Sequence, residues 1–332
     1  MNAPEIFQHY ASELKQVETE LGNIFASTVP LIPLVGTHIM GGGGKRMRPL
    51  FLLLSADLCG YAGPKRAILG AVIEAIHTAS LLHDDVIDAA ETRRGRTAAH
   101  MLWGNHVVVL IGDFLYSNAL RIAVNQENQK IMNALSEATT RMTEAEILQL
   151  NKTGDPDITE EEYFRIISGK TGVLISAACR IGAVLGGAFD EQEAALRDFG
   201  LKAGIAFQLA DDVLDYVAQQ AALGKKLGKY LEEGKITMPL IHLLRDASPR
   251  EREEIAERIK LTASGQNGGS QDGDKHLARI VELFGTYHSI DKAMATAQSL
   301  IDEAYAALAV FPHSSHKEAL LSLAAFAMQR KS

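Results

Sequence analysis

The stretch AILGAVIEAIHTASLLHDDVID, residues 67–88, decides the fold class of this chain. It contains no proline and is apolar on nearly every side when it is drawn as a helix. A helix of this kind belongs at the centre of a bundle rather than on its surface. We therefore predict a buried helix over residues 66–89, with other helices packed around it.

The rest of the chain has the same helical character. Proline breaks helix interiors, and none occurs between Pro64 and Pro156 or between Pro156 and Pro239. Apolar residues mostly recur at i, i+3 and i+4, the spacing of one helix face. Val107–Ile111 is the best strand candidate, but it lies inside a longer apolar tract. The sequence therefore predicts an all-α fold, with helices over residues 5–27, 47–60, 66–89, 107–124, 127–150, 160–168, 172–186, 190–217, 235–246, 249–261, 275–284, 287–309 and 316–329.

One polar, glycine-rich segment interrupts this pattern. Residues 262–275, TASGQNGGSQDGDK, predict a mobile surface loop. The segment could also be a domain linker, but the stretch of chain after it is too short to form an independent core. We therefore expect a single domain over residues 1–332.

Length and composition exclude several classes of protein. With 332 residues, 47% of them apolar and 22% charged, the chain has the composition of an ordinary globular protein, not of a disordered or collagen-like one. Its two cysteines, Cys59 and Cys179, are too few for a framework of several disulfides and fit a reducing compartment. The net charge of −8 disfavours binding to nucleic acid. No signal peptide or membrane span stands out, so we expect a cytoplasmic protein.

Two copies of one acidic pattern, D-D-x-x-D, lie in apolar helical stretches. They are Asp84-Asp85-Val86-Ile87-Asp88 and Asp211-Asp212-Val213-Leu214-Asp215. The outer aspartates of each copy are four residues apart, so they share a helix face, where like charges repel. Paired oxygen ligands suit Mg²⁺, which is often shared with substrate phosphates. One copy alone would more often be a solvated acidic face or a helix cap, but two copies favour metal ions held around a diphosphate.

The helical phase adds two polar residues to these faces. His77 is seven residues before Asp84 and eleven before Asp88, so the three fall in one narrow stripe. Gln208 likewise shares a face with the second acidic motif. A histidine in such a helix is usually a packed core residue, but the alignment with carboxylates favours a phosphate contact for His77.

Basic residues near the motifs match a second anion. The segment Gly41–Pro49, GGGGKRMRP, combines glycines that permit close backbone approach with three cations. It is not a P-loop, because no Ser or Thr follows the lysine. The segment Thr92–Arg96, TRRGR, directly follows the first acidic helix. Solvated charges in a flexible loop are the alternative interpretation. Further candidates, each more often a surface residue when taken singly, are Lys170 with Thr171, Lys225 and Lys235.

With these segments the chain resembles the trans-isoprenyl diphosphate synthases, or polyprenyl synthetases, and most closely their long-chain members. The matching segments occur in family order over about residues 40–242 and are GGGGKRMRP, HTASLLHDDVIDAAETRRGR, WGNHVVVLIGDFLYSNAL, GKTGVLISAA, FQLADDVLDY and LGKKLGKYLEEGKITMPLI. The resemblance implies a bundle of antiparallel helices around a deep central cavity, as a homodimer. It also implies head-to-tail addition of isopentenyl diphosphate to an allylic diphosphate such as farnesyl diphosphate, giving a quinone side-chain precursor.

The resemblance implies a role for each matching residue. Mg²⁺ would be the cofactor, with about three ions per active site. Its ligands would be Asp84, Asp88 and Asp211, supported directly or through water by Asp85, Asp212 and Asp215. Isopentenyl diphosphate would be bound by Lys45, Arg48, His77 and Arg94. The allylic diphosphate would be bound by Arg93, Lys170, Thr171, Gln208, Lys225 and Lys235, of which Lys170 and Lys225 would also assist its departure.

Two positions bear on metal binding and product length. Tyr230 stands where the family usually has an aspartate that supports the third metal ion, so metal binding is expected to be weaker. Ser80 lies one turn before Asp84, and its neighbour Ala79 is where short-chain members tend to carry an aromatic ring. Both residues are small, as close helix packing would also require. With the resemblance, they predict an open tunnel and products of about eight prenyl units.

Other functions of such a chain would differ in testable ways. A farnesyl or geranylgeranyl diphosphate synthase would stop at a shorter product. A non-catalytic subunit of a heteromeric synthase would make no product alone, although such subunits typically lose acidic-motif residues. A terpene cyclase would not need the cations expected to bind a second diphosphate. A structural helical bundle would show no Mg²⁺-dependent binding of diphosphate.

Overall fold

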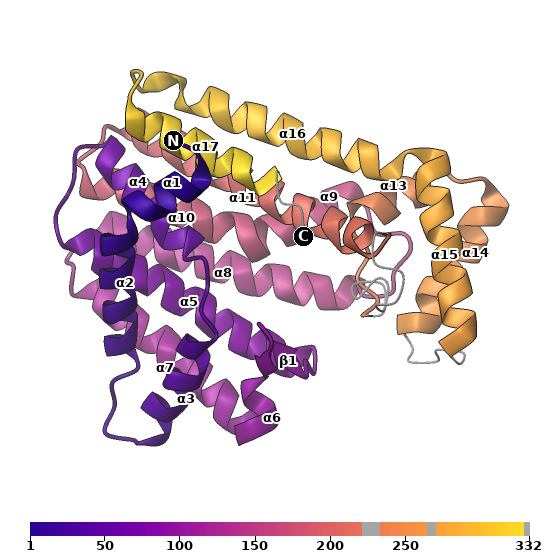
Figure 1. Cartoon of the computed structure of the whole chain (residues 1–332), viewed down its shortest axis with the longest axis horizontal. Coiled ribbons are helices and arrows are strands. Elements are labelled where there is room, and N and C mark those ends of the chain that lie inside the picture. Colours follow the sequence, from indigo (N-terminus) through magenta and orange to yellow (C-terminus); the bar gives the residue numbers. More distant parts are fainter. Residues whose placement is uncertain (221–232, 264–269, 329–332) are drawn as a thin grey trace. The chain divides into compact units, whose positions relative to one another are not determined.

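The computed structural model describes residues 1–220, 233–263 and 270–328. Within these ranges the chain is helical nearly throughout, with one two-stranded hairpin (Figure 1). The elements are α1 (Ala3–His9), α2 (Ala11–Ile24), α3 (Leu31–Gly41), α4 (Met47–Leu58), α5 (Lys65–Ile87), β1 (Thr92–Arg93), β2 (Arg96–Thr97), α6 (Ala99–Trp103), α7 (Asn105–Val124), α8 (Gln129–Lys152), α9 (Glu160–Ile167), a π-helical turn (Ser168–Gly172), α10 (Val173–Leu185), α11 (Asp190–Gln220), α13 (Met238–Asp246), α14 (Pro249–Ala263), α15 (Ser270–Tyr287), α16 (Ser289–Ala307), a 3₁₀ turn (Leu308–Val310) and α17 (Ser315–Met328).

The prediction of an all-α chain is confirmed, with differences in detail. The helix predicted over residues 5–27 is two helices, α1 and α2, which meet at Tyr10. Helix α3 was not predicted, because two prolines bracket its start. Pro30 is its N-cap and Pro33 lies in its first turn, where a missing N–H costs little. The loop predicted over 262–275 is too long, since α14 ends at Ala263 and α15 begins at Ser270; residues 264–269 lie outside the described residues.

The chain divides into two compact units, each assembled from three separate stretches. The first unit comprises Met1–Thr139, Leu174–Gly200 and Ala307–Leu323, and the second comprises Thr140–Val173, Leu201–Ala306 and Ala324–Ser332. Neither unit is a continuous segment, because helices α8 and α11 contribute residues to both. The single domain expected from the sequence stays a prediction.

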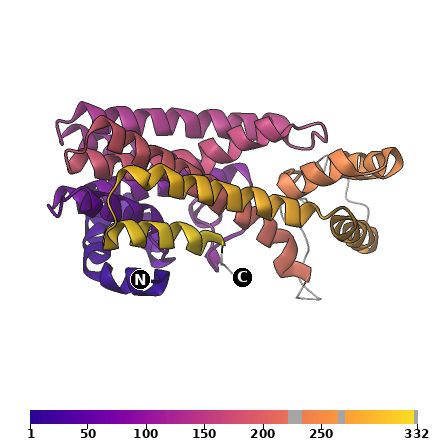
Figure 2. The same cartoon turned by 90° about the horizontal axis from the view of Figure 1, so that it is seen from above.

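Helix α5 forms the core of the first unit, as its sequence predicts. It packs against α2, α4 and α7 (Figure 1), and Figure 2 shows this indigo-to-purple part of the chain from above. Several apolar residues of its first half, such as Leu69, Val72, Ile73 and Ile76, are fully buried. The first acidic motif therefore lies at the C-terminal end of a helix whose position is fixed by packing on several sides.

The second unit has its own apolar core. Residues from α9, α11, α13, α14, α15 and α16 form one buried cluster, with Tyr216 and Phe284 in edge-to-face contact at a ring distance of 5.0 Å. A capping box at Thr159 and Glu162 fixes the start of α9. This core supports the part of α11 that carries the second acidic motif.

Among the described residues, two helical stretches are long and apolar enough to cross a membrane by length and composition alone. They are Asn105–Val124, with 33% of its most apolar 18-residue window buried, and Glu160–Leu185, with 89% of that window buried. Burial inside the fold is what a core helix shows, and Glu160–Leu185 is interrupted by the π-helical turn. The expectation that no segment spans a membrane stays a prediction.

Candidate active site

The first acidic motif lies at the end of α5. Asp84 and Asp85 are in its last turn, and Asp88 is its C-cap, whose N–H donates to the Asp84 carbonyl at 2.8 Å. Asp84 and Asp88 are half-buried, whereas Asp85, about 100° further round the helix, is buried. The outer pair shares a face as predicted, and the middle aspartate points elsewhere.

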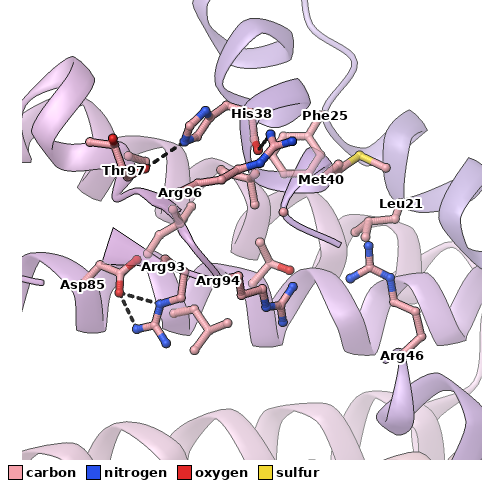
Figure 3. A pocket seen from close by; sticks show the side chains of 16 residues that line it. Leu21, Phe25, His38, Met40, Arg46, Asp85, Arg93, Arg94, Arg96 and Thr97 are labelled. Atoms are coloured by element: carbon pink, nitrogen blue, oxygen red, sulfur yellow. Dashed lines mark hydrogen bonds and ion pairs between the residues drawn. The ribbon is translucent and has the colours of Figure 1, made fainter. Parts of the chain in front are cut away.

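The hairpin after α5 supplies a partner for the middle aspartate. Its turn residues Arg94 and Gly95 have φ of 50° and 73°, the left-handed pair that a tight two-residue hairpin requires. This turn folds Arg93 back over α5, where its Nε donates to Asp85 Oδ1 at 2.8 Å and its Nη2 donates to the same oxygen (Figure 3). Arg93, predicted to bind the allylic diphosphate, is thus ion-paired with Asp85, which offsets the repulsion within the motif.

The glycine-rich loop is fixed by an arginine that sequence reasoning passed over. Arg46 is the N-cap of α4 with a left-handed φ of 50°, and its side chain is only 7% exposed. Its Nη1 donates to Glu74 of α5 at 2.9 Å, and its Nε donates to Glu18 at 3.3 Å. The signal that could have found it is Glu74, a carboxylate within an apolar helix, which requires a buried cation as partner.

The glycine-rich loop also packs against the arginines of the hairpin. A Cβ atom at Gly44 would lie 2.8 Å from Nη1 of both Arg46 and Arg94, so only glycine fits there without displacing them. Arg94 also donates to the carbonyl of Gly43. These arginines face a pocket with an apolar side formed by Leu21, Phe25 and Met40 (Figure 3), and its remaining lining residues are His38, Ile39, Gly42, Thr78, Leu81, Leu82, Asp85, Arg93, Arg96, Thr97 and Ala99. Of the predicted site residues, the pocket contains Asp85, Arg93 and Arg94.

His77 lies among positive charges. Desolvation, followed by the charges of Arg48, Arg94, Arg93 and Arg46, lowers the pKa of His77 well below its usual value. The imidazole is therefore neutral at pH 7 and has one N–H to donate. The charges that act on His77 show that Arg48 and Arg94 lie in its neighbourhood. That these three residues bind isopentenyl diphosphate together with Lys45 stays a prediction.

The two positions expected to set product length lie on α5. Ala79 is buried, and Ser80 is half-buried with its hydroxyl donating to the His77 carbonyl at 2.8 Å. This is an ordinary bond for a serine within a helix. Whether either residue lines the tunnel stays a prediction.

In the second unit, a π-helical turn presents Lys170 and Thr171. Such turns add one residue to a helix and often occur at functional sites. Gly169 permits the turn to contact α8, because a Cβ atom there would lie 2.4 Å from Ala145 and 2.6 Å from the Arg141 carbonyl. Lys170 is ion-paired with Glu146 of α8 at 2.9 Å. The turn therefore has a fixed place against α8.

A chain of hydrogen bonds joins this turn to the second acidic motif. The Thr171 hydroxyl donates to Gln208 Oε1 at 2.7 Å, and Gln208 Nε2 donates to Asp212 Oδ1 at 2.9 Å. Tyr163 of α9 donates to the other oxygen of Asp212 at 2.6 Å. Three predicted site residues are thus in direct contact, and Tyr163 joins them although nothing in the sequence marked it beyond its position in an amphipathic helix.

The middle aspartate is again the buried one. Asp211 and Asp215 are half-buried on one face of α11, whereas Asp212 is 4% exposed. Burial, with added repulsion from Asp211 and Asp215, raises the pKa of Asp212 to about 7, although its bonds with Tyr163 and Gln208 favour the charged form. The bonds from Tyr163 and Gln208 take one acceptor position on each oxygen of this buried carboxylate and leave the second position of each oxygen. Whether Asp212 supports the metal ions directly or through water stays a prediction.

Two further lysines of the second unit, Lys152 and Lys235, line one pocket with these residues. Lys235 is ion-paired with Glu233 at 2.9 Å, and Lys152, which was not predicted, is ion-paired with Glu162 at 2.9 Å and Asp155 at 3.0 Å. The pocket is lined by Gln149, Lys152, Thr153, Ile158, Tyr163, Ile166, Ile167, Lys170, Gln208, Asp212, Lys235, Ile236 and Thr237. Lys225 and Tyr230 lie outside the described residues.

The donors of both motifs fit Mg²⁺. Within the described ranges, no group of three or more His, Cys, Asp or Glu side chains converges into a protein-only metal site. Mg²⁺ does not need one, because it is commonly held by one or two carboxylates together with water and substrate phosphates. Each motif offers two such carboxylates on one helix face. The first motif lies in the first unit and the second in the other, so their convergence around one diphosphate stays a prediction.

Comparisons with known proteins agree with this interpretation. The chain is 39% identical over 331 residues to the octaprenyl diphosphate synthase of Escherichia coli, covering 99% of each protein. The crystal structure of a decaprenyl diphosphate synthase from Rhodobacter capsulatus superimposes with a TM-score of 0.90 at 35% identity, covering 98% of both chains. A polyprenyl synthase from Caulobacter crescentus, complexed with calcium and isoprenyl diphosphate, superimposes with a TM-score of 0.89 at 36% identity, covering 98% of this chain and 97% of that one. The family model described as polyprenyl synthetase matches residues 29–271, and the chain belongs to this family.

Proposed function

We propose that the chain is a long-chain all-trans polyprenyl diphosphate synthase that adds isopentenyl diphosphate repeatedly to an allylic diphosphate such as farnesyl diphosphate. The observation that carries the proposal is the paired architecture of the acidic motifs. In each, the outer aspartates share a half-buried face while the middle one is buried and bonded, as Asp85 is to Arg93 and Asp212 to Tyr163. Its support is the full-length identity of 39% to an octaprenyl diphosphate synthase. By this analogy the product has about eight prenyl units and serves as a quinone side-chain precursor.

The outer aspartates would hold Mg²⁺, about three ions per active site, with Asp84 and Asp88 on one side and Asp211 on the other. When bound, Mg²⁺ withdraws electrons from the allylic diphosphate and stabilises its departure. Arg93, Lys170, Lys225 and Lys235 bind that diphosphate and neutralise the charge that develops on it, while Thr171 and Gln208 bind it through hydrogen bonds. Positioned cations act in this way without reorganising during the reaction.

Isopentenyl diphosphate occupies the second diphosphate position. Lys45, Arg48 and Arg94 hold its charge, and His77 donates one N–H as a neutral imidazole. Departure of the diphosphate leaves an allylic cation, which the double bond of isopentenyl diphosphate attacks, and a proton is then lost to the released diphosphate. Apolar helices such as α5 exclude water from the cation. The product is five carbons longer and reacts again.

We also infer that the enzyme acts in the cytoplasm as a homodimer. Helices α6 and α7 expose large apolar side chains, namely Met101, Leu102, Val109 and Leu110. Helices α6 and α7 contact each other, and exposed large apolar side chains on neighbouring helices favour a surface that associates with protein. A second copy of the chain is the partner that the family suggests.

The test of the proposed reaction compares two incubations of the purified chain. Farnesyl diphosphate and Mg²⁺ are supplied with and without isopentenyl diphosphate, and diphosphate release is measured. A prenyltransferase releases diphosphate at its full rate only when isopentenyl diphosphate is present. Equal release in both incubations would indicate a terpene cyclase, and no release in either would indicate a non-catalytic subunit or a structural bundle.

A further inference from the structure

We infer that Tyr163 is a positioning residue for the allylic diphosphate, acting through Asp212 on Gln208. The inference rests on the proposed function, in which Gln208 and Thr171 bind that diphosphate. Tyr163 has no role in the reaction as described above. It lies in α9, is 2% exposed, and lines the same pocket as Lys170, Gln208 and Asp212.

The geometry makes the three residues act as one unit. The carboxylate of Asp212 accepts from Tyr163 on one oxygen at 2.6 Å and from Gln208 on the other at 2.9 Å. The carboxamide of Gln208 is engaged at both ends, since its oxygen accepts from Thr171 at 2.7 Å. A free carboxamide can flip end for end, but this one has a single orientation that satisfies both neighbours. The orientation of Gln208 therefore depends on Asp212, whose own orientation depends on Tyr163.

Removing the Tyr163 hydroxyl removes the hydrogen bond that it donates to Asp212. Asp212 would keep one of its two side-chain donors, and a buried carboxylate that lacks a donor turns toward others. Asp212 sits beside Asp211 and three residues before Asp215, the face proposed to hold Mg²⁺. A carboxylate that turns toward this face, and a Gln208 that follows it, would disturb the allylic diphosphate site. Binding of isopentenyl diphosphate, assigned to residues of the first unit, would be spared.

The chain offers a matched control for the loss of such a bond. Tyr10 is also 2% exposed, and its hydroxyl donates at 2.6 Å to Asp57, which is not among the predicted site residues. Tyr163→Phe and Tyr10→Phe therefore each remove a tyrosine–aspartate bond of the same length. Each aspartate keeps a second donor, Gln208 for Asp212 and Arg66 for Asp57. We expect similar decreases in melting temperature for both variants. Only Tyr163→Phe should weaken the allylic site.

The experiment measures binding and turnover in the full-length protein. Binding of the unreactive thiolodiphosphate analogue of farnesyl diphosphate is measured by calorimetry with Mg²⁺, and KM is measured for each substrate. For Tyr163→Phe we expect about a tenfold loss of analogue affinity and a matching rise in the allylic KM, with the KM for isopentenyl diphosphate unchanged. Equal behaviour of Tyr163→Phe and Tyr10→Phe would overturn the inference. Absence of turnover in the unaltered protein would instead overturn the proposed function.

A second variant tests whether Tyr163 acts through Asp212. Asp212→Asn places an amide NH₂ against one of the two donors, Tyr163 or Gln208. This variant should therefore by itself bind the farnesyl analogue more weakly. It keeps the inference testable even if Tyr163→Phe fails to fold. Adding Tyr163→Phe removes one of the opposing donors, so the double variant should bind the analogue no more weakly than Asp212→Asn alone. Losses that multiply in the double variant would show that the two residues act independently and would overturn the inference.

Discussion

Replacing Glu74 by glutamine should destabilise the first unit. It should also weaken the binding of isopentenyl diphosphate more than that of the allylic diphosphate. Glu74 forms a buried ion pair with Arg46 at 2.9 Å, with side-chain exposures of 4% and 7%. Removing one partner of a buried pair costs about 3–5 kcal/mol, because the other charge stays buried. In the variant, Arg46 keeps its contact to Glu18 at 3.3 Å, so we expect a loss of about 3 kcal/mol in unfolding free energy, the lower end of the range. The loss is not abolished, because Glu18 is 48% exposed and does not replace a buried partner.

Urea unfolding measures this loss, and Glu137→Gln is its control. Glu137 is 56% exposed and forms an ion pair with Arg180 at 3.5 Å. In Glu137→Gln, Arg180 keeps its second ion pair, with Glu193 at 2.8 Å, so the free energy of unfolding should fall by less than about 1 kcal/mol. Because Arg46 lies between Lys45 and Arg48, Glu74→Gln should also raise the KM for isopentenyl diphosphate more than the allylic KM. Equal unfolding free energies for Glu74→Gln and Glu137→Gln would refute the reasoning.

Three further predictions concern the reaction. Asp84→Ala and Asp211→Ala should each lower turnover by at least about a hundredfold, since each removes a proposed metal ligand at the departing diphosphate; a rate above about a tenth of normal at saturating Mg²⁺ would contradict the assignment. Arg48→Ala should raise the KM for isopentenyl diphosphate and leave the allylic KM nearly unchanged, and equal losses for both substrates would argue against two separate diphosphate positions. Ala79→Tyr should shorten the product to about three or four prenyl units, because a packed cavity cannot absorb the ring; chromatography of the dephosphorylated products tests this, and an unchanged long product would show that α5 does not line the tunnel at this level.

The sequence predicted most of the fold because its signals were local. Apolar periodicity and the scarcity of proline located the long helices, and the all-round apolar character of residues 67–88 placed α5 in a core. Helix α3 escaped prediction because prolines at its start mimic a break. The short hairpin escaped because two residues per strand leave no alternating pattern.

The candidate site was predictable in composition but not in its contacts. The spacing of D-D-x-x-D correctly put the outer aspartates on one face, because that follows from helical geometry alone. It could not show that Asp85 is bonded to Arg93 or Asp212 to Tyr163, since those bonds depend on how a hairpin and a neighbouring helix pack. Arg46 was likewise hidden between two cations that seemed equivalent to it.

The length of the product tests the central claim most directly. The purified protein, alone with Mg²⁺, farnesyl diphosphate and excess labelled isopentenyl diphosphate, should accumulate all-trans products of about eight prenyl units, by analogy with the octaprenyl diphosphate synthase that it resembles over its full length. Products that end at about four units under the same conditions, one addition beyond the farnesyl primer, would contradict a long-chain synthase and identify a shorter-chain enzyme.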